Sequence, residues 1–270
     1  MQATRTPDEV LAKIPGWAGA AWTELEGGLT NRAYHVSRNF QHGVLKFDDL
    51  VRDEPLNTRR AEADVQSIAA QAGLAPRVLF VDENVFLTEY VDGTVWQPQC
   101  LRKTGNLELL AAAMKRLHGL PLTGRSFDAT AASRRYLENI RHPDASLVEL
   151  CNQVIERTRL PHKLSCCHND LVAENMITAP DLLFIDWEYA CDNDPCFDLA
   201  TVVEHHRLPE EQVRRLLDAY FGADGQRWSL HLAEQQKLYL ALLWLWMASL
   251  PENCPGELDQ VAERLTTSCS

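Results

Sequence analysis

The stretch that decides the fold is CHNDLVAENMI at 167–177, followed by LLFIDWE at 182–188. It has the form HxDxxxxN and continues into an apolar strand that ends in an aspartate. Phosphoryl transfer needs a carboxylate that accepts the proton of the attacking hydroxyl, and oxygen ligands for a Mg²⁺ that bridges the phosphates. Asp170 suits the first role, and Asn175 with Asp186 suits the second.

The spacing supports this interpretation. Asn175 lies five residues after Asp170 on the same loop, so that its side chain can reach back to the same site. Asp186 stands at the end of a hairpin strand, where a carboxylate is held rigidly. A structural alternative is that His168 and Asp170 tie a buried loop together while Asp186 caps a turn. The four residues taken together favour the catalytic interpretation.

Composition excludes several other classes. The chain has 270 residues, of which 46% are hydrophobic, so it can bury a full core as two lobes or two domains. Its formal net charge of -12 and the absence of a basic cluster argue against a nucleic-acid partner, whereas an acidic surface suits a cationic substrate.

The location expected from the sequence is the cytoplasm. The N-terminus has no apolar signal core, and the richest apolar run, at 238–250, is too short to span a bilayer, so we expect no membrane insertion. Eight cysteines are present without a CxxC pair, which is typical of reduced thiols.

The first part of the chain has the pattern of a β-sheet with one main helix. Thr6-Pro7-Asp8-Glu9 predicts a capping box and a short helix to about residue 14. We expect strands at 21–26, 33–36 and 43–47, a helix at 55–72 that ends before Gly73, and strands at 78–81 and 85–90.

The rest of the chain is mainly helical. Helical periodicity predicts helices at 107–119, 129–141, 145–159, 209–221 and 228–249. The sequence therefore predicts an α+β fold of two lobes, a sheet lobe at 1–92 and a mainly helical lobe at 93–270.

The segment HNDLVAENMI…LFIDWEYA resembles the aminoglycoside phosphotransferase and choline kinase superfamily, which is related to the eukaryotic protein kinases. The resemblance spans nearly the whole chain and implies a protein-kinase-like fold. Asp-Trp-Glu stands where protein kinases have Asp-Phe-Gly, which favours a small-molecule acceptor. The resemblance implies that Asp170 is the catalytic base, that Asn175 and Asp186 are magnesium ligands, and that His168 supports the loop.

The resemblance also implies an ATP site in the first lobe. Lys46, on a third strand followed by a helix with a glutamate, is the expected contact of the ATP α- and β-phosphates, and Glu62 is its expected partner. Alternatively, Glu62 pairs with Arg59 or Arg60 on the surface of its own helix.

Two further segments complete the expected nucleotide site. The phosphate-covering loop is expected at Gly27, Gly28, Thr30 and Asn31, although a double-glycine turn is by itself only a hairpin signal. Backbone groups around Glu89 and Val91 are expected to bind the adenine edge. Asp198 resembles the aspartate that holds the catalytic loop, although a helix N-cap is an equally natural role for it.

The acceptor is expected to bind beside aromatic and acidic residues: Trp187, Glu188, Tyr189 and Trp244. Aromatic faces and carboxylates recognise quaternary ammonium groups. Trp244 and Trp246 lie two residues apart and cannot share one helical face, so at least one is expected in the core.

The expected reaction is ATP-dependent phosphorylation of a cationic alcohol, choline or a related amino alcohol. Thiamine and an aminoglycoside or sugar-like alcohol remain as alternative acceptors, and a nucleotide-binding pseudokinase remains as a different class. The sequence leaves the oligomeric state open.

Overall fold

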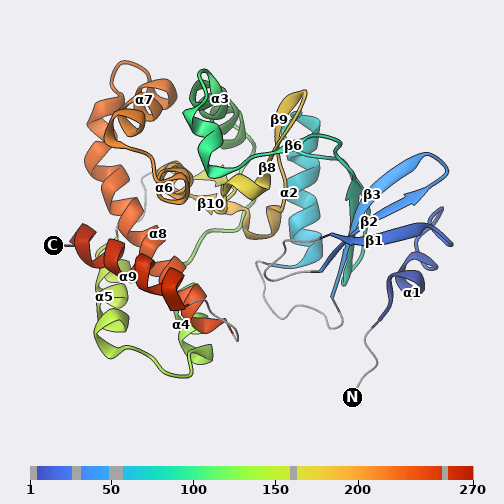
Figure 1. The fold of residues 1–270 in the computed structure, drawn as a ribbon, viewed down its shortest axis with the longest axis horizontal. Coiled ribbons are helices and arrows are strands. Elements are labelled where there is room, and N and C mark those ends of the chain that lie inside the picture. Colours follow the sequence, from blue (N-terminus) through green and yellow to red (C-terminus); the bar gives the residue numbers. More distant parts are fainter. Residues whose placement is uncertain (1–4, 26–31, 49–56, 159–162, 251–254, 270) are drawn as a thin grey trace. The chain divides into compact units, whose positions relative to one another are not determined.

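The computed structural model describes residues 5–25, 32–48, 57–158, 163–250 and 255–269. The chain forms two compact units, one of residues 1–97 with 174–190, and one of residues 98–173 with 191–270. Figure 1 shows the elements of both units along the chain, and each unit is described by itself.

The first unit is built on a five-stranded antiparallel sheet with the strand order β1-β2-β3-β5-β4. The strands are β1 (Ala21–Leu25), β2 (Ala33–Arg38), β3 (Gln41–Phe47), β4 (Val78–Val81) and β5 (Val85–Glu89). All five were predicted from the alternation of apolar residues and from the intervening turn residues.

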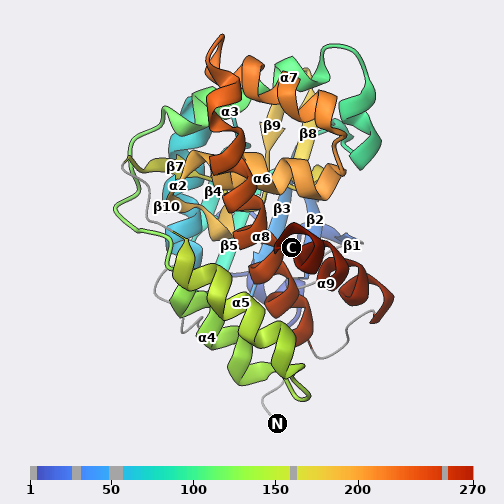
Figure 2. The same cartoon turned by 90° about the vertical axis from the view of Figure 1, so that its left-hand side faces the viewer.

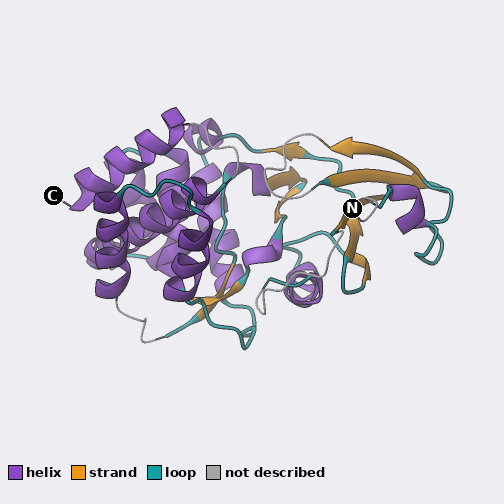
Figure 3. Ribbon diagram, turned by 90° about the horizontal axis from the view of Figure 1, so that it is seen from below, coloured by secondary structure: helices purple, strands orange, loops and turns teal. Residues whose placement is uncertain are grey.

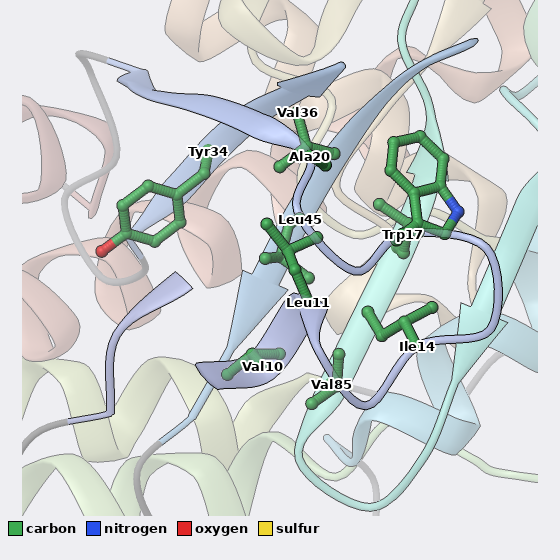
Figure 4. Packing of buried hydrophobic residues seen from close by; sticks show 10 residues of the cluster. Val10, Leu11, Ile14, Trp17, Ala20, Tyr34, Val36, Leu45 and Val85 are labelled. Atoms are coloured by element: carbon green, nitrogen blue, oxygen red, sulfur yellow. The ribbon is translucent and has the colours of Figure 1, made fainter. Parts of the chain in front are cut away.

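One face of this sheet packs on the short helix α1 (Pro7–Leu11). The helix begins at a capping box, as predicted, because the Thr6 side chain accepts from the backbone of Glu9 and the Glu9 side chain accepts from the backbone of Thr6. Figure 4 shows the shared core, which consists of Val10, Leu11, Ile14, Trp17, Ala20, Tyr34, Val36, Leu45, Val85 and Leu87.

The main helix of this unit is α2 (Arg59–Gln71). It begins later than the predicted residue 55, because Thr58 caps it by accepting a hydrogen bond from the backbone of Ala61. It ends as predicted before Gly73, whose φ of 67° is in the left-handed region that glycine adopts freely.

Residues 174–190 fold with the first unit, whereas the sequence boundary placed them with 93–270. The reason is strand pairing, since β8 (Met176–Ala179) pairs with both β6 (Thr94–Val95) and β9 (Asp181–Phe184). The backbone N–H of Phe184 also donates to the carbonyl of Leu74.

The second unit is mainly helical, as predicted, and Figure 3 shows the contrast with the strands of the first unit. Its α-helices are α3 (Asn106–His118), α4 (Ala129–Asn139), α5 (Ala145–Arg157), α6 (Pro195–His206), α7 (Glu210–Phe221), α8 (Ser229–Ser249) and α9 (Pro255–Cys269). Two short strands, β7 (Ser165–Cys167) and β10 (Cys191–Asn193), pair antiparallel.

Helix α8 organises this unit. It packs against α4, α5, α6 and α9, and Figure 2 shows it running between α6 and α5. Within the described part of the chain, no helix combines the length and apolar character needed to cross a membrane.

Candidate active site

A buried lysine organises the charged residues of the first unit. The Nζ atom of Lys46 lies 2.8 Å from Oδ1 of Asp186 and 3.7 Å from Oε1 of Glu62. The Lys46 side chain is only 13% exposed. The structure thus brings together three residues that the sequence assigned to one site.

Local structure explains how they meet. Residues of β3 alternate between faces, so that Leu45 enters the core with α1 while Lys46 points to the opposite face. Glu62 lies in the first turn of α2. Asp186 follows β9 in the left-handed conformation, with φ and ψ both 64°, which is uncommon outside glycine and frequent at functional sites.

Glu62 has a second cationic partner, Arg59. Nη1 of Arg59 lies 2.9 Å from Oε2 of Glu62, and the two side chains are fully buried. The guanidinium also donates two hydrogen bonds to the Asp48 carboxylate, of 2.8 and 3.0 Å. The alternative pairing with Arg59 within the helix is therefore present beside the Lys46 pair, but it is buried and not on the surface as expected.

The surrounding carboxylates keep Lys46 charged. Burial alone would lower the pKa of Lys46, but the attraction of Asp186 and then Glu62 outweighs it, so the pKa is raised above its ordinary value. Burial also raises the pKa of the Glu62 carboxyl, against the opposing effect of the Lys46 and Arg59 cations. Lys46 therefore carries a positive charge throughout the neutral range.

Two oxygen-bearing residues fit a divalent cation. Asn175 ends the short helix η2 (Ala173–Asn175), is buried, and accepts through its backbone carbonyl from the N–H of Ile185 at 3.0 Å. This bond ties Asn175 to the residue before Asp186. An amide oxygen and a carboxylate are ligands of the kind that Mg²⁺ prefers, so the residues present fit that ion.

The loop that carries Asp170, the predicted catalytic base, lies in the second unit and is held by Asp198. The Asp198 carboxylate accepts from the backbone N–H groups of His168 at 2.9 Å and Asn169 at 2.7 Å. Asn169 has a φ of 64°, and Asp170 follows it, partly exposed. The alternative that Asp198 caps its helix is wrong, because the N-cap of α6 is Asp194.

His118 and Tyr220 extend this arrangement and were not assigned to it from the sequence. Nε2 of His118 lies 3.0 Å from Asp198, and Nδ1 lies 2.6 Å from the hydroxyl of Tyr220. Burial raises the pKa of Tyr220, so its hydroxyl stays protonated and can donate. His118 and Asp198 are 80 positions apart in the sequence, so no local pattern could have revealed the contact.

A side-chain bond supports the loop from β10. The Nδ2 group of Asn193 donates to Oδ1 of Asn169 at 2.8 Å. Burial raises the pKa of the neighbouring thiols Cys166 and Cys191 to about 12. The cysteines in the described part of the chain are free, as predicted, and these two are protonated and unreactive at neutral pH.

Several predicted nucleotide contacts have no structural test. Gly27, Gly28, Thr30 and Asn31 lie outside the described residues. Glu89 ends β5, its side chain pairs with Arg77 at 2.9 Å, and its backbone N–H donates to the carbonyl of Arg77. Base binding by the backbone around Glu89 and Val91 stays a prediction.

The predicted acceptor residues have different surroundings. Trp187 is fully buried, and its indole N–H donates to the carbonyl of Phe184 at 2.9 Å. Trp187 is therefore packed in the core of the first unit, and its predicted contact with the acceptor stays a prediction. Glu188 is buried near Lys46, and its charge contributes to the raised Lys46 pKa, whereas Tyr189 is partly buried.

Trp244 belongs to the second unit. It is 3% exposed and lines a cavity of about 430 Å³ together with residues of α4, α5, α8 and α9. Asp170 is not among the lining residues. The role of Trp244 in acceptor binding stays a prediction.

Comparison with known proteins identifies the family. Residues 21–232 match the phosphotransferase enzyme family (APH). Protein LicA of Haemophilus influenzae is 33% identical over 208 residues, which cover 72% of this chain and 61% of the relative. Thiamine kinase of Salmonella typhimurium is 32% identical, with 80% of this chain and 76% of the relative covered.

Solved structures confirm the predicted two-lobed α+β fold. Choline kinase LicA from Streptococcus pneumoniae superposes with a TM-score of 0.79 at 21% identity, covering 92% of each chain. At this identity the likeness concerns the fold alone. The chain spans less than two thirds of the first relative's length, but the family model matches residues 21–232, more than half of this chain, so the chain belongs to the phosphotransferase enzyme family.

Proposed function

We propose that this chain is an ATP-dependent kinase that phosphorylates the hydroxyl of a small cationic alcohol, choline or a related amino alcohol. The observation that carries the proposal is the buried Lys46, paired with Asp186 and Glu62. A buried cation among several carboxylates suits the binding of phosphate groups and a divalent ion. We further propose that the enzyme works in the cytoplasm.

The relatives support the substrate class. Their names include a choline kinase and a thiamine kinase, and ethanolamine kinase 2 of mouse is 27% identical to this chain. A structure of LicA with the same fold contains AMP, which supports a nucleotide as phosphate donor.

In the proposed reaction Asp170 accepts the proton of the acceptor hydroxyl. The hydroxyl oxygen forms a bond to the γ-phosphorus while the bond from that phosphorus to the bridging oxygen of ADP breaks. Asp198 holds the backbone of His168 and Asn169 and so fixes the position of Asp170 along the loop. His168 is fully buried and has a supporting role.

Lys46 is proposed to bind the α- and β-phosphates. Its positive charge is secured by Glu62, which Arg59 holds from the other side. Asn175 and Asp186 would hold Mg²⁺, which neutralises the charge of the phosphates when it is bound. The remaining work of the chain is positioning.

The test measures Mg-ATP consumption by the purified protein with choline, ethanolamine, thiamine, amino sugars and aminoglycosides. The Asp170→Asn variant should lose turnover by about 10²- to 10⁴-fold, since general-base catalysis contributes that much, while nucleotide binding is retained. Asp181→Asn, at an exposed carboxylate of the neighbouring hairpin, is the matched control and should keep wild-type turnover.

The outcomes separate the alternatives. Turnover with one cationic alcohol, lost in Asp170→Asn, supports the proposal and identifies the acceptor. Turnover with thiamine or an aminoglycoside selects one of the other acceptors. ATP binding without turnover on any alcohol supports the pseudokinase, and near-normal turnover of Asp170→Asn contradicts the role of Asp170.

A further inference from the structure

Three side chains of the second unit, Asp194, Cys196 and His231, form a cluster that the proposed reaction does not use. One oxygen, sulfur or ring nitrogen atom of each lies within 4.8 Å of the other two. Asp194 is the N-cap of α6 and Cys196 lies in the first turn of that helix. His231 lies in the first turn of α8, which packs against α6 (Figure 2). We call these three residues the α6 cluster.

The two carboxylate oxygens of Asp194 have different contacts. Oδ1 accepts a hydrogen bond of 2.8 Å from the backbone N–H of Cys196, which caps α6. Oδ2 lies 2.5 Å from Nε2 of His231. The Asp194 side chain is only 4% exposed, and Cys196 is fully buried. The cap therefore fixes the carboxylate with Oδ2 directed at the imidazole and close to the thiol.

His231 also has a carboxylate on its other side. Its Nδ1 atom lies 3.9 Å from Oε2 of Glu234, one turn further along α8. A histidine that binds a metal ion commonly directs its second ring nitrogen to a carboxylate, which orients the ring and raises its basicity. The His231 side chain is 31% exposed, so an ion can enter the α6 cluster from solvent on this side.

A buried amide lies on the same face of α8. Gln235 follows His231 by four residues, so the two side chains share one helical face. Gln235 is 2% exposed, and within the described part of the chain its Oε1 atom is buried without a hydrogen-bond partner. Such unpaired buried acceptors are uncommon. A water molecule that completes the coordination of an ion at the α6 cluster would supply a donor on this face.

The charges of the α6 cluster decide which ion it suits. The N-terminus of a helix carries a partial positive charge, which by itself disfavours a cation. The Asp194 carboxylate and a Cys196 thiolate together offset it with two negative charges. Burial raises the pKa of the Cys196 thiol, so the thiol stays protonated until a metal ion displaces its proton. A metal ion with high affinity for sulfur is therefore required.

We propose that Asp194, Cys196 and His231 form a binding site for Zn²⁺ or a similar transition-metal ion, separate from the proposed Mg²⁺ site of the first unit. Thiolate, imidazole and carboxylate are zinc ligands, whereas Mg²⁺ takes oxygen ligands. On binding, a bond from zinc to sulfur replaces the S–H bond of Cys196, and the proton passes to solvent. The ion joins α8 to the first turn of α6, the helix that carries Asp198.

A second group of the same residue types, His118, Cys167 and Asp198, is a poorer candidate. Asp198 already accepts from two backbone N–H groups of the loop that carries Asp170. His118 contacts Asp198 through one ring nitrogen and Tyr220 through the other. A metal ion there would break the bonds that hold the loop, whereas at the α6 cluster it displaces one contact between Asp194 and His231.

The experiment uses Co²⁺ as a spectroscopic probe and Zn²⁺ as its competitor. The full-length protein is first treated with a chelator and then titrated in excess Mg²⁺. Cobalt bound to a thiolate gives a charge-transfer band in the near ultraviolet that oxygen and nitrogen ligands do not give. Wild type should develop this band up to about one Co²⁺ per chain, lose it when Zn²⁺ is added, and release about one proton per ion. Zn²⁺ should also raise the melting temperature.

The variants test the ligands one at a time. Cys196→Ser keeps the size of the side chain and should abolish the band. Loss of a partner outside the ligand shell costs about 10- to 100-fold in metal affinity, so Glu234→Gln should weaken zinc binding by about tenfold and His231→Ala by more than that. Cys151→Ser, which removes another buried thiol of the same unit, is the matched control and should keep both the band and the affinity.

A wild-type protein without the band, or a band that remains in Cys196→Ser, would overturn the proposal. A band lost in Cys167→Ser but kept in Cys196→Ser would also overturn it, because the ion would then lie at the other group. His231→Ala changes a partly exposed side chain and tests the site even if the serine variant does not fold, which thermal unfolding checks. Turnover is not measured, so failure here leaves the proposed kinase function untouched.

Discussion

The two units hold their site residues by different kinds of interaction. In the first unit, Lys46, Glu62 and Asp186 are positioned by charge pairs between side chains. In the second unit, the Asp198 carboxylate accepts from two backbone N–H groups of the loop that carries Asp170. A charged ligand can compete for a side chain that is held in an ion pair. A backbone conformation that is fixed by a buried carboxylate, in contrast, is already formed before a ligand binds.

The net charge of the side chains around Lys46 in the first unit fits this difference. Lys46 and Arg59 are surrounded by four carboxylates, Asp48, Glu62, Asp186 and Glu188. Among these described residues, two positive charges face four negative ones. The excess negative charge is of the size that one divalent cation would balance, so the proposed binding of Mg²⁺ and phosphates would give these ion pairs a reason to rearrange.

The largest stability effect is expected in the second unit. Asp198→Asn keeps the shape of the side chain but places an amide N–H₂ group against a buried backbone donor. A buried donor left unsatisfied, together with the loss of a charged acceptor, is expected to cost about 3 kcal/mol in the free energy of unfolding. Urea unfolding measures it, and turnover should fall with it because the loop that carries Asp170 loses its position.

The control for this variant is Asp181→Asn, at an exposed carboxylate that should change stability little. If Asp198→Asn unfolds at the same urea concentration as wild type, the hydrogen bonds from His168 and Asn169 do not hold the loop. The contrast between the two units would then disappear.

The sequence predicted the parts of the site that follow from local periodicity and spacing. Lys46 was placed on a predicted strand at 43–47, and the apolar strand before Asp186 placed that carboxylate at the end of a hairpin. Both strands are present because short strand patterns depend little on the rest of the fold.

Other features depend on contacts between distant segments. The sequence could not show that Trp187 would donate its indole N–H inside a core. An aromatic residue can line a pocket or pack in a core, and the sequence does not distinguish the two. Helix α6 was not predicted as a periodic segment, since it is buried on nearly all sides and lacks a polar face. Helix α9 was not predicted either.

A smaller stability effect is expected from the same isosteric change in the first unit. Glu62→Gln removes a carboxylate between Lys46 and Arg59 but also removes the cost of burying that charge. We expect a change of about 1 kcal/mol or less in the free energy of unfolding at neutral pH, because replacing a buried ionic group is often close to neutral. The KM for ATP should rise, since Lys46 loses one of its two carboxylate partners.

The stability of wild type relative to Glu62→Gln is expected to change with pH in a definite direction. Because burial raises the Glu62 pKa above 4.5, the folded state favours the protonated carboxyl. That contribution to stability is present below the unfolded pKa and is lost as pH rises through the folded pKa. Wild type should therefore lose stability relative to Glu62→Gln on going from pH 4 to pH 7 in paired urea titrations. The opposite trend would show that Lys46 and Arg59 outweigh burial.

The smallest effect is expected at an exposed pair of the first unit, Arg77 and Glu89. The hydrogen bond from Arg77 lowers the pKa of Glu89 below its ordinary value. This pair therefore contributes stability above the unfolded pKa of 4.5, and the contribution is lost as pH falls through the folded pKa. Glu89→Gln should lower the melting temperature by about one degree or less at neutral pH, because exposed ion pairs contribute little.

This variant also sharpens the contrast between side-chain and backbone roles. If Glu89 contacts the nucleotide only through its backbone, Glu89→Gln leaves the KM for ATP unchanged while Glu62→Gln raises it. A matched increase in both KM values would show that the Glu89 carboxylate itself acts on nucleotide binding. High salt should abolish the small stability difference at Glu89, since exposed charges are screened, and should leave the buried pair of Glu62 and Arg59 largely unaffected.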